Sequence, residues 1–179
     1  HNVSNALAAI SVALELDVSV DLIRNGLASF GGVERRFHIR GEKGGVMVVD
    51  DYGHHPTEIR ATLAASKAAW DRRVIAIFQP HRYTRTRDLA DEFVNAFEQA
   101  DIVFITDIYP AGEEALPGIT GELVAEKVRS SGHQSVHWVN GTSDLVGHIK
   151  KSIQPGDVVI TLGAGDIWKV GKDILGSLS

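Results

Sequence analysis

The sequence has 179 residues, of which 44% are hydrophobic, enough for one well-packed globular domain with an appendage. The net charge of −5 gives no support to general nucleic-acid binding, and no stretch approaches the roughly 20 apolar residues that a membrane-spanning helix needs. The absence of cysteine excludes a disulfide scaffold, thiolate metal sites and a cysteine nucleophile, and it fits a reducing cytoplasm.

The first thirty residues predict two helices. Residues Asn2–Leu16 repeat apolar side chains at helical spacing, and Ser19 is a suitable N-cap for a second helix that continues to Phe30 and stops at Gly31 and Gly32. The two helices have little apolar core of their own, and the chain opens inside a helix without a methionine. We therefore expect this segment to belong to a preceding domain of a longer protein.

A β-hairpin is expected next. Arg36–Arg40 and Val46–Asp51 are typical of two strands, and residues 41–45 supply a glycine-containing loop between them. Pro56 suits the first turn of a helix that continues to about Trp70.

Strands and helices alternate over the rest of the chain. The predicted strands are Val74–Phe78, Ile102–Thr106, Ser135–Val139 and Val158–Leu162, and the predicted helices are Asp88–Gln99, Gly121–Ser130, Asp144–Ile153 and Asp166–Leu175. Continuous apolar strands between amphipathic helices favour a mostly parallel sheet that is covered on both faces. The sequence thus predicts an α/β protein, a Rossmann-like three-layer α/β/α sandwich preceded by a β-hairpin and two short helices.

Polar residues cluster directly after three of the predicted strands, in residues 50–56, 79–87 and 107–113. In such a sheet ligands bind at the carboxyl ends of the strands. We therefore expect one rim of the sheet to bring together the side chains of Asp51, His54, Arg82 and Arg85.

The second cluster holds Arg82, Arg85 and Arg87 in a chain that is acidic overall. Arginine forks suit bidentate contact with a carboxylate or a phosphate. The alternative is a solvated loop whose arginines pair with Asp88, Asp91 and Glu92. The position at a strand end, next to His81, favours the ligand-binding interpretation.

Two other patterns give weaker indications. His54 and His55 follow Asp50 and Asp51, but no third ligand has convincing spacing, so we expect no dedicated metal site; one histidine would orient the loop while the other faces a ligand. Turn hydrogen bonds from Asp51 and His54 are the simpler alternative.

Residues 163–166 resemble half of a dinucleotide fingerprint, which leaves a dinucleotide-binding oxidoreductase as a second hypothesis. No G-x-x-x-x-G-K-[ST] loop is present, so another segment would have to complete any triphosphate site.

Several motifs in chain order resemble the Mur ligase family. They are His1–Ala9, Arg35–Phe37, Asp50–Glu58, Phe78–Thr86, Tyr109–Glu113 and Leu162–Ile167. The nine residues Phe78–Thr86 match the branch that adds L-alanine to UDP-N-acetylmuramate, whereas the tripeptide-recycling relatives share only the His54–Thr57 segment. The resemblance covers essentially the whole chain.

The resemblance implies that residues 1–31 end the central ATPase domain and residues 32–179 form the amino-acid-binding C-terminal domain. The N-terminal domain, which binds the UDP-sugar, and most of the central domain, which carries the phosphate loop and the Mg²⁺ ligands, would be missing. The implied enzyme is an ATP-dependent amide ligase of peptidoglycan synthesis in the bacterial cytoplasm, and we expect this fragment to be inactive alone. A non-catalytic nucleotide-binding module is the further alternative.

The resemblance also implies roles for single residues in nucleotide binding. Asn2 and Asn5 resemble the pair that faces the adenine of ATP. Arg36 resembles the arginine that reaches the phosphates, and Asp51 the acceptor for the ribose hydroxyls.

For L-alanine, the resemblance implies that His81, Arg82 and Arg85 hold the carboxylate. His54 would position the ammonium group or accept its proton before the amine attacks. Tyr52 would line the methyl pocket and reject larger side chains.

Overall fold

The chain divides after Val33. In the computed structural model, which describes residues 2–178 and only the backbone of Asn2, His1–Val33 and Glu34–Ser179 form two separate compact units. The first unit contains α1 (Asn2–Glu15) and α2 (Val20–Ser29), as predicted. The Ser19 hydroxyl caps α2 by accepting the Leu22 N–H at 3.4 Å, and α2 buries none of its side chains.

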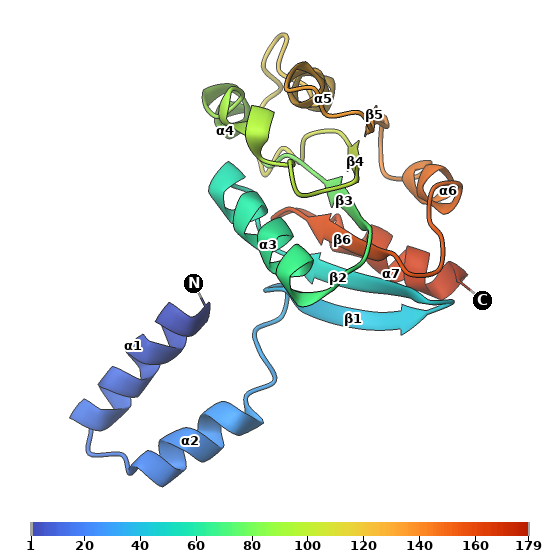
Figure 1. The fold of residues 1–179 in the computed structure, drawn as a ribbon. Helices are drawn as coiled ribbons and strands as arrows, with labels where there is room; N and C mark the ends of the chain where they lie inside the picture. Colours follow the sequence, from blue (N-terminus) through green and yellow to red (C-terminus); the bar gives the residue numbers. More distant parts are fainter. Residues whose placement is uncertain (1, 179) are drawn as a thin grey trace. The chain divides into compact units, whose positions relative to one another are not determined.

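A six-stranded sheet organises the second unit, in the order β1-β2-β6-β3-β4-β5 (Figure 1). The strands are β1 (His38–Lys43), β2 (Val46–Asp51), β3 (Val74–Phe78), β4 (Ile102–Ile105), β5 (Val136–Trp138) and β6 (Val158–Leu162). Only β1 runs antiparallel to its neighbour, and the other four pairings are parallel. The last strand in the chain therefore lies at the middle of the sheet, between β2 and β3.

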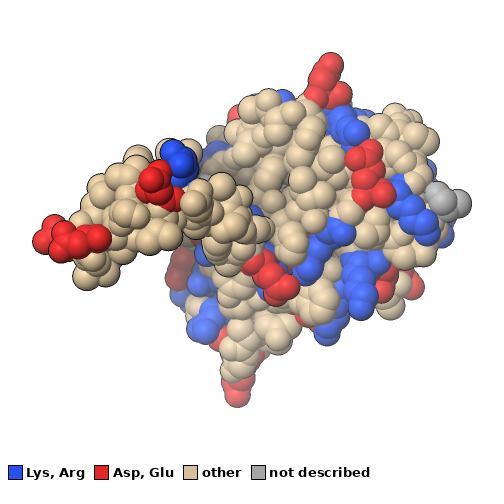
Figure 2. Space-filling view, turned by 90° about the horizontal axis from the view of Figure 1, so that it is seen from below, with Lys and Arg blue, Asp and Glu red and all other residues tan. Residues whose placement is uncertain are grey.

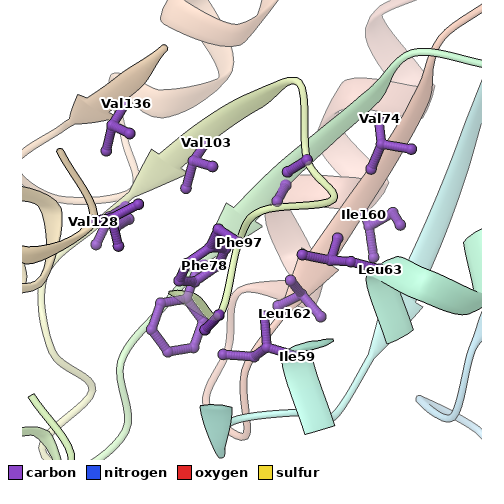
Figure 3. Packing of buried hydrophobic residues seen from close by; sticks show 14 of the residues in the cluster. Ile59, Leu63, Val74, Phe78, Phe97, Val103, Val128, Val136, Ile160 and Leu162 are labelled. Atoms are coloured by element: carbon purple, nitrogen blue, oxygen red, sulfur yellow. The ribbon is translucent and has the colours of Figure 1, made fainter. Parts of the chain in front are cut away.

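Helices cover both faces of this sheet (Figure 1). One face packs against α3 (Pro56–Ala69), η1 (Glu92–Asn95) and α5 (Gly121–Ser130), and the other packs against α6 (Leu145–Lys150) and α7 (Trp168–Ser177). Alternate strand residues serve the two cores, because successive side chains of a strand point to opposite faces. Figure 3 shows the first core, in which the rings of Phe78 and Phe97 lie 5.4 Å apart beside Ile59, Leu63 and Leu162. The predicted three-layer sandwich is confirmed.

The hairpin prediction was wrong at its first strand. β1 covers His38–Lys43, not Arg36–Arg40, and it contains an irregular register between Ile39 and Gly41. Gly44 and Gly45 both have positive φ, of 57° and 73°, which permits a tight two-residue connection. The first strand therefore extends through most of the segment that the sequence predicted to be loop.

The prediction of one α-helix over Asp88–Gln99 was also wrong. The α-helix here is α4 (Tyr83–Asp88), with Leu89 as its C-cap, and beyond it only the short 3₁₀ helix η1 lies within the predicted range. Tighter turns let Phe93, Ala96 and Phe97 reach the core within a short stretch. The other predicted elements exist, with ends that differ by up to three residues.

Charged residues of both signs are interspersed on the face of the molecule shown in Figure 2. Among the described residues, no helix is both long enough and apolar enough to cross a membrane.

Candidate functional site

The carboxyl ends of the parallel strands lie side by side. Asp51 at the end of β2 pairs in register with Leu162 of β6, and Leu162 pairs with Phe78 at the end of β3. The loops that follow these strands therefore meet at one rim. Across that rim the ring centroids of His54 and His81 are 5.7 Å apart.

The loop after β2 is fixed by its own side chains. Asp51 is only 4% exposed, and its two carboxylate oxygens accept the N–H groups of Gly53 and Phe37, both at 2.7 Å. Burial is the largest effect on the pKa of Asp51 and raises it above its ordinary value. Thus Asp51 makes the anchoring contacts that the turn hypothesis expects.

His55 and Glu58 cap α3. The His55 Nδ1 atom accepts the Thr57 N–H at 3.3 Å, and Glu58 Oε2 accepts the N–H groups of His54 and His55 at 3.0 and 3.1 Å. This is a capping box in which histidine takes the place of serine or threonine. His55 thus orients the loop, and His54 is the histidine that lies beside His81.

Hydrogen bonding defines the tautomer of His54. Its Nδ1 lies 3.1 Å from the carbonyl oxygen of Tyr52, and only a protonated nitrogen can donate to a carbonyl. Burial, followed by the positive charge of Arg85, lowers the pKa of His54 from its ordinary value. The ring is therefore neutral near pH 7, with the lone pair on Nε2.

His81 has the opposite arrangement. The Arg85 Nη1 donates to His81 Nδ1 at 3.1 Å, so the neutral ring carries its proton on Nε2. Burial and then the charge of Arg85 lower the pKa of His81 to about 4. His81 Nε2–H and the guanidinium groups of Arg82 and Arg85 together form a donor-rich cluster at the start of α4.

The backbone of Arg82 is in an unfavourable conformation. Its φ is +70° with ψ of 138°, a region that residues other than glycine rarely occupy. The Arg82 N–H donates to the Tyr109 carbonyl at 2.9 Å, and its carbonyl accepts the hydroxyl of Thr86 at 2.7 Å. One contact from a neighbouring loop and one from α4 itself therefore hold the backbone of Arg82 in place.

The surface-pair alternative applies to only one of the three arginines. Arg87 is exposed and pairs with Asp88 at 2.7 Å, whereas Asp91 pairs with Lys127 at 2.6 Å. Arg82 Nη1 instead lies 3.7 Å from Glu113 Oε1, and Arg85 donates to His81.

Arg35 is a rim residue that was not singled out from the sequence. Its Nη2 donates to the Gly163 carbonyl at 2.6 Å, and its Nε lies 3.2 Å from Asp50, a carboxylate that is 1% exposed. The guanidinium groups of Arg35 and Arg36 lie 5.1 and 5.6 Å from the centroid of the Tyr52 ring. The Arg35–Phe37 motif indicated an arginine here, but not which of the two would be tied to the sheet.

Tyr109 is a second residue that lies in a sequence motif but was assigned no role from it. Its ring stacks on His81 at 5.6 Å with an interplanar angle of 8°. A Cβ atom added at Gly165 would lie 2.6 Å from Tyr109 Cγ, so a side chain there would displace the ring.

The turn after β6 also contacts Gln79, whose Oε1 accepts the Ile167 N–H at 3.2 Å. Residues 163–166 thus form a closely packed strand-to-helix turn, and Gln79 already binds the Ile167 amide that follows the turn.

The two asparagines of the candidate site belong to the smaller unit. Asn5 lies on α1 with an exposed side chain, and the side chain of Asn2 lies outside the described residues. Within residues 2–178 the structure shows no group of three or more His, Asp or Glu side chains that could hold a metal ion.

Comparison with known proteins supports the resemblance drawn from the motifs. The family model described as "Mur ligase, glutamate ligase domain" matches residues 35–165. The UDP-N-acetylmuramate–L-alanine ligase of Geobacter sp. (strain M21) is 53% identical over 98% of this chain and 38% of its own length. That of Anaeromyxobacter sp. (strain Fw109-5) is 54% identical over 99% of this chain and 39% of its own length. The chain therefore spans about two fifths of the length of the curated relatives that it matches.

Solved structures agree in fold. The UDP-N-acetylmuramate–alanine ligase from Thermotoga maritima superposes with a TM-score of 0.83 at 30% identity, over 98% of this chain and 37% of that one. A murein peptide ligase from Psychrobacter arcticus gives a TM-score of 0.72 at 26% identity, over 100% of this chain and 38% of that one. The family model covers the whole rim from Arg35 to Gly165, and on these grounds the chain belongs to the Mur ligase family.

Proposed function

We propose that this chain is the C-terminal portion of a UDP-N-acetylmuramate–L-alanine ligase, with residues 1–31 ending the central ATPase domain and residues 32–179 forming the amino-acid-binding domain. The observation that carries the proposal is the rim itself, where two neutral imidazoles of opposite tautomer lie beside two arginines. The similarity to ligases of that name supports it. The reaction would transfer a phosphoryl group from ATP to the muramic-acid carboxylate, which releases ADP and forms an acyl phosphate. The amine of L-alanine would attack this acyl phosphate to give the amide and phosphate.

The donor cluster suits the carboxylate of L-alanine. The Nε2–H of His81 and the guanidinium groups of Arg82 and Arg85 offer hydrogen-bond donors and two positive charges. Because Arg85 also donates to His81 Nδ1, it keeps the His81 proton on the nitrogen that would face the ligand.

The amine of L-alanine would lie at His54. A lone pair on Nε2 accepts a hydrogen bond from the amino group and orients it for attack, and the neutral ring avoids repulsion of an ammonium cation. Tyr52, whose ring lies 5.4 Å from that of His54 in an edge-on arrangement, would line the methyl pocket. Holding both ends of a small amino acid reduces the entropy cost of reaching the attack geometry.

The nucleotide would be shared with other segments. We propose that Asn2 and Asn5 face the adenine, that Arg36 reaches the phosphates and that Asp51 accepts from the ribose. ATP with Mg²⁺ supplies the phosphoryl group and charge neutralisation, and we place the Mg²⁺ ligands mainly in the central domain. The chain alone would then be inactive, and the complete ligase would work in the bacterial cytoplasm without nucleic-acid or membrane partners.

A domain replacement tests this function. The chain would replace the corresponding 38% of the Geobacter sp. (strain M21) ligase, and phosphate release would be measured with ATP, UDP-N-acetylmuramate and each of several amino acids. We expect turnover that depends on all three substrates and prefers L-alanine. A folded replacement ligase with no amino-acid-dependent turnover would contradict the proposal.

The second candidate, a dinucleotide-binding oxidoreductase, is tested by titrating the 179-residue chain with NADH. We expect weak or no binding, because Gln79 Oε1 already accepts the Ile167 N–H, the amide that directly follows the Gly163–Asp166 turn. Tight binding would favour the oxidoreductase.

A further inference from the structure

The loop between β4 and α5 contacts the arginine cluster in three places. The Tyr109 carbonyl accepts the Arg82 N–H at 2.9 Å, and the Tyr109 ring stacks on His81. The third contact is the carboxylate of Glu113, which reaches the first turn of α4. The proposed roles of the rim residues do not account for Glu113.

Glu113 makes several interactions with α4. Its Oε2 accepts the Thr84 N–H at 3.0 Å, its Oε1 accepts the Thr84 hydroxyl at 2.7 Å, and Oε1 lies 3.7 Å from Arg82 Nη1. Arg82 makes no cap hydrogen bond with its own side chain, so Glu113 supplies the acceptor that the start of a helix needs. The hydrogen bonds from Thr84, followed by the charge of Arg82, lower the pKa of Glu113, which is therefore ionised at neutral pH.

A tight turn directs the side chain of Glu113 toward α4. The Glu113 N–H donates to the Pro110 carbonyl at 3.0 Å, and the two residues between them, Ala111 and Gly112, have positive φ of 50° and 85°. Positive φ at both central positions is typical of a type I′ turn, which sends the chain sharply back. The side chain of Glu113 is only 20% exposed.

We propose that Glu113 is a positioning residue for amino-acid binding. Its carboxylate holds the first turn of α4, so that Arg82 and Arg85 point toward the place where the carboxylate of the amino acid would bind. The proposal rests on the proposed function and extends it to the β4–α5 loop. Arg82 needs such support because its backbone conformation is unfavourable, and an unsupported residue would relax out of it. Glu113 also balances part of the positive charge of the cluster when no amino acid is bound.

The test compares Glu113→Ala and Glu113→Gln with Glu114→Ala in the replacement ligase. Glu114 is the adjacent, exposed carboxylate and serves as the matched control. Because a small displacement of a binding group can cost up to about 100-fold, we expect Glu113→Ala to raise the KM for L-alanine roughly 10-fold or more. Glu113→Gln keeps the size but loses the charge, so it should fall between wild type and Glu113→Ala. The KM for ATP should stay within about twofold, which a general loss of structure would not allow.

A KM for L-alanine within about twofold of wild type in folded Glu113→Ala would overturn the proposal while leaving the proposed function intact. Inactivity of the unsubstituted replacement ligase would count against the proposed function alone. Hydrogen exchange of the Thr84 amide in the 179-residue chain tests the contact without any activity. Faster exchange in Glu113→Ala than in Glu114→Ala supports the role of Glu113, and equal exchange overturns it.

Discussion

The rings of His54 and His81 lie 5.7 Å apart and are held in opposite tautomers, one by the carbonyl of Tyr52 and the other by the guanidinium of Arg85. One ring therefore presents a lone pair at Nε2 and the other a proton at the same atom. Under the proposed function, this difference would let two identical side chains serve the two ends of an amino acid.

The pH dependence of stability should reflect His81. Its pKa is about 4 in the folded chain and about 6.5 when unfolded, so the unfolded state binds the proton first as the pH falls. Stability should therefore decrease from about pH 6.5 down to about pH 4, and His81→Gln should show less of this decrease. Urea unfolding of the unsubstituted chain and of His81→Gln, at pH 7 and at pH 5, measures this loss of stability. Equal losses in the two chains would contradict the assignment.

Arg82→Ala should weaken L-alanine binding selectively. Losing a hydrogen bond to a charged group costs about 1.5–3 kcal/mol, which corresponds to a roughly 10- to 100-fold higher KM for L-alanine in the replacement ligase. The KM for ATP should change little. Arg87→Ala is the matched control, because Arg87 pairs with Asp88 on the surface. Equal effects of Arg82→Ala on both substrates would argue against a carboxylate clamp.

Arg82→Gly should be more stable than Arg82→Ala, although both lack the guanidinium group. Glycine adopts a φ of +70° without steric cost, whereas alanine does not, and the difference should be about 1–2 kcal/mol. Urea unfolding of the two variants measures it. If the two midpoints coincide, the backbone strain at this position is absent.

Tyr52→Ala should broaden the amino-acid preference. Removing the ring enlarges the proposed methyl pocket, so turnover with larger amino acids should rise relative to L-alanine, by about 10-fold for one or two added methylene groups. Tyr52→Phe keeps the ring that packs against His54 and should keep the preference. An unchanged preference in Tyr52→Ala would exclude a role in size selection.

Gly165→Ala should cost about 1–3 kcal/mol of stability, because the added methyl group collides with Tyr109 and Gln79. The displaced Tyr109 ring would also release His81, which should weaken L-alanine binding. Gly176→Ala on α7 is the control, since a Cβ there meets no atom within 4 Å and alanine favours the helix. Thermal unfolding and the KM for L-alanine should separate the two variants.

The sequence predicted most of the sheet because its signals are local. Continuous apolar runs such as Val74–Phe78 and Val158–Leu162 identify buried strands, and both were placed with the correct bounds. Pro56 and Ser19 likewise mark helix starts through local chemistry. The helix predicted over Asp88–Gln99 failed because contacts with the core, not periodicity, decide how that segment turns.

The sequence by itself determined which residues are candidates for the chemistry, since the segments after the strands contain their histidines and arginines whatever the sheet order. Only the tertiary structure decided which of them meet. β6 is the last strand in the chain, yet it lies between β2 and β3. This order brings Gly165 against the ring of Tyr109 and the guanidinium group of Arg35 against the carbonyl of Gly163. Such pairings depend on long-range strand contacts and on the packing of whole faces, and no local sequence pattern specifies them. The tautomers of His54 and His81 and the contacts of Glu113 with α4 follow from that arrangement.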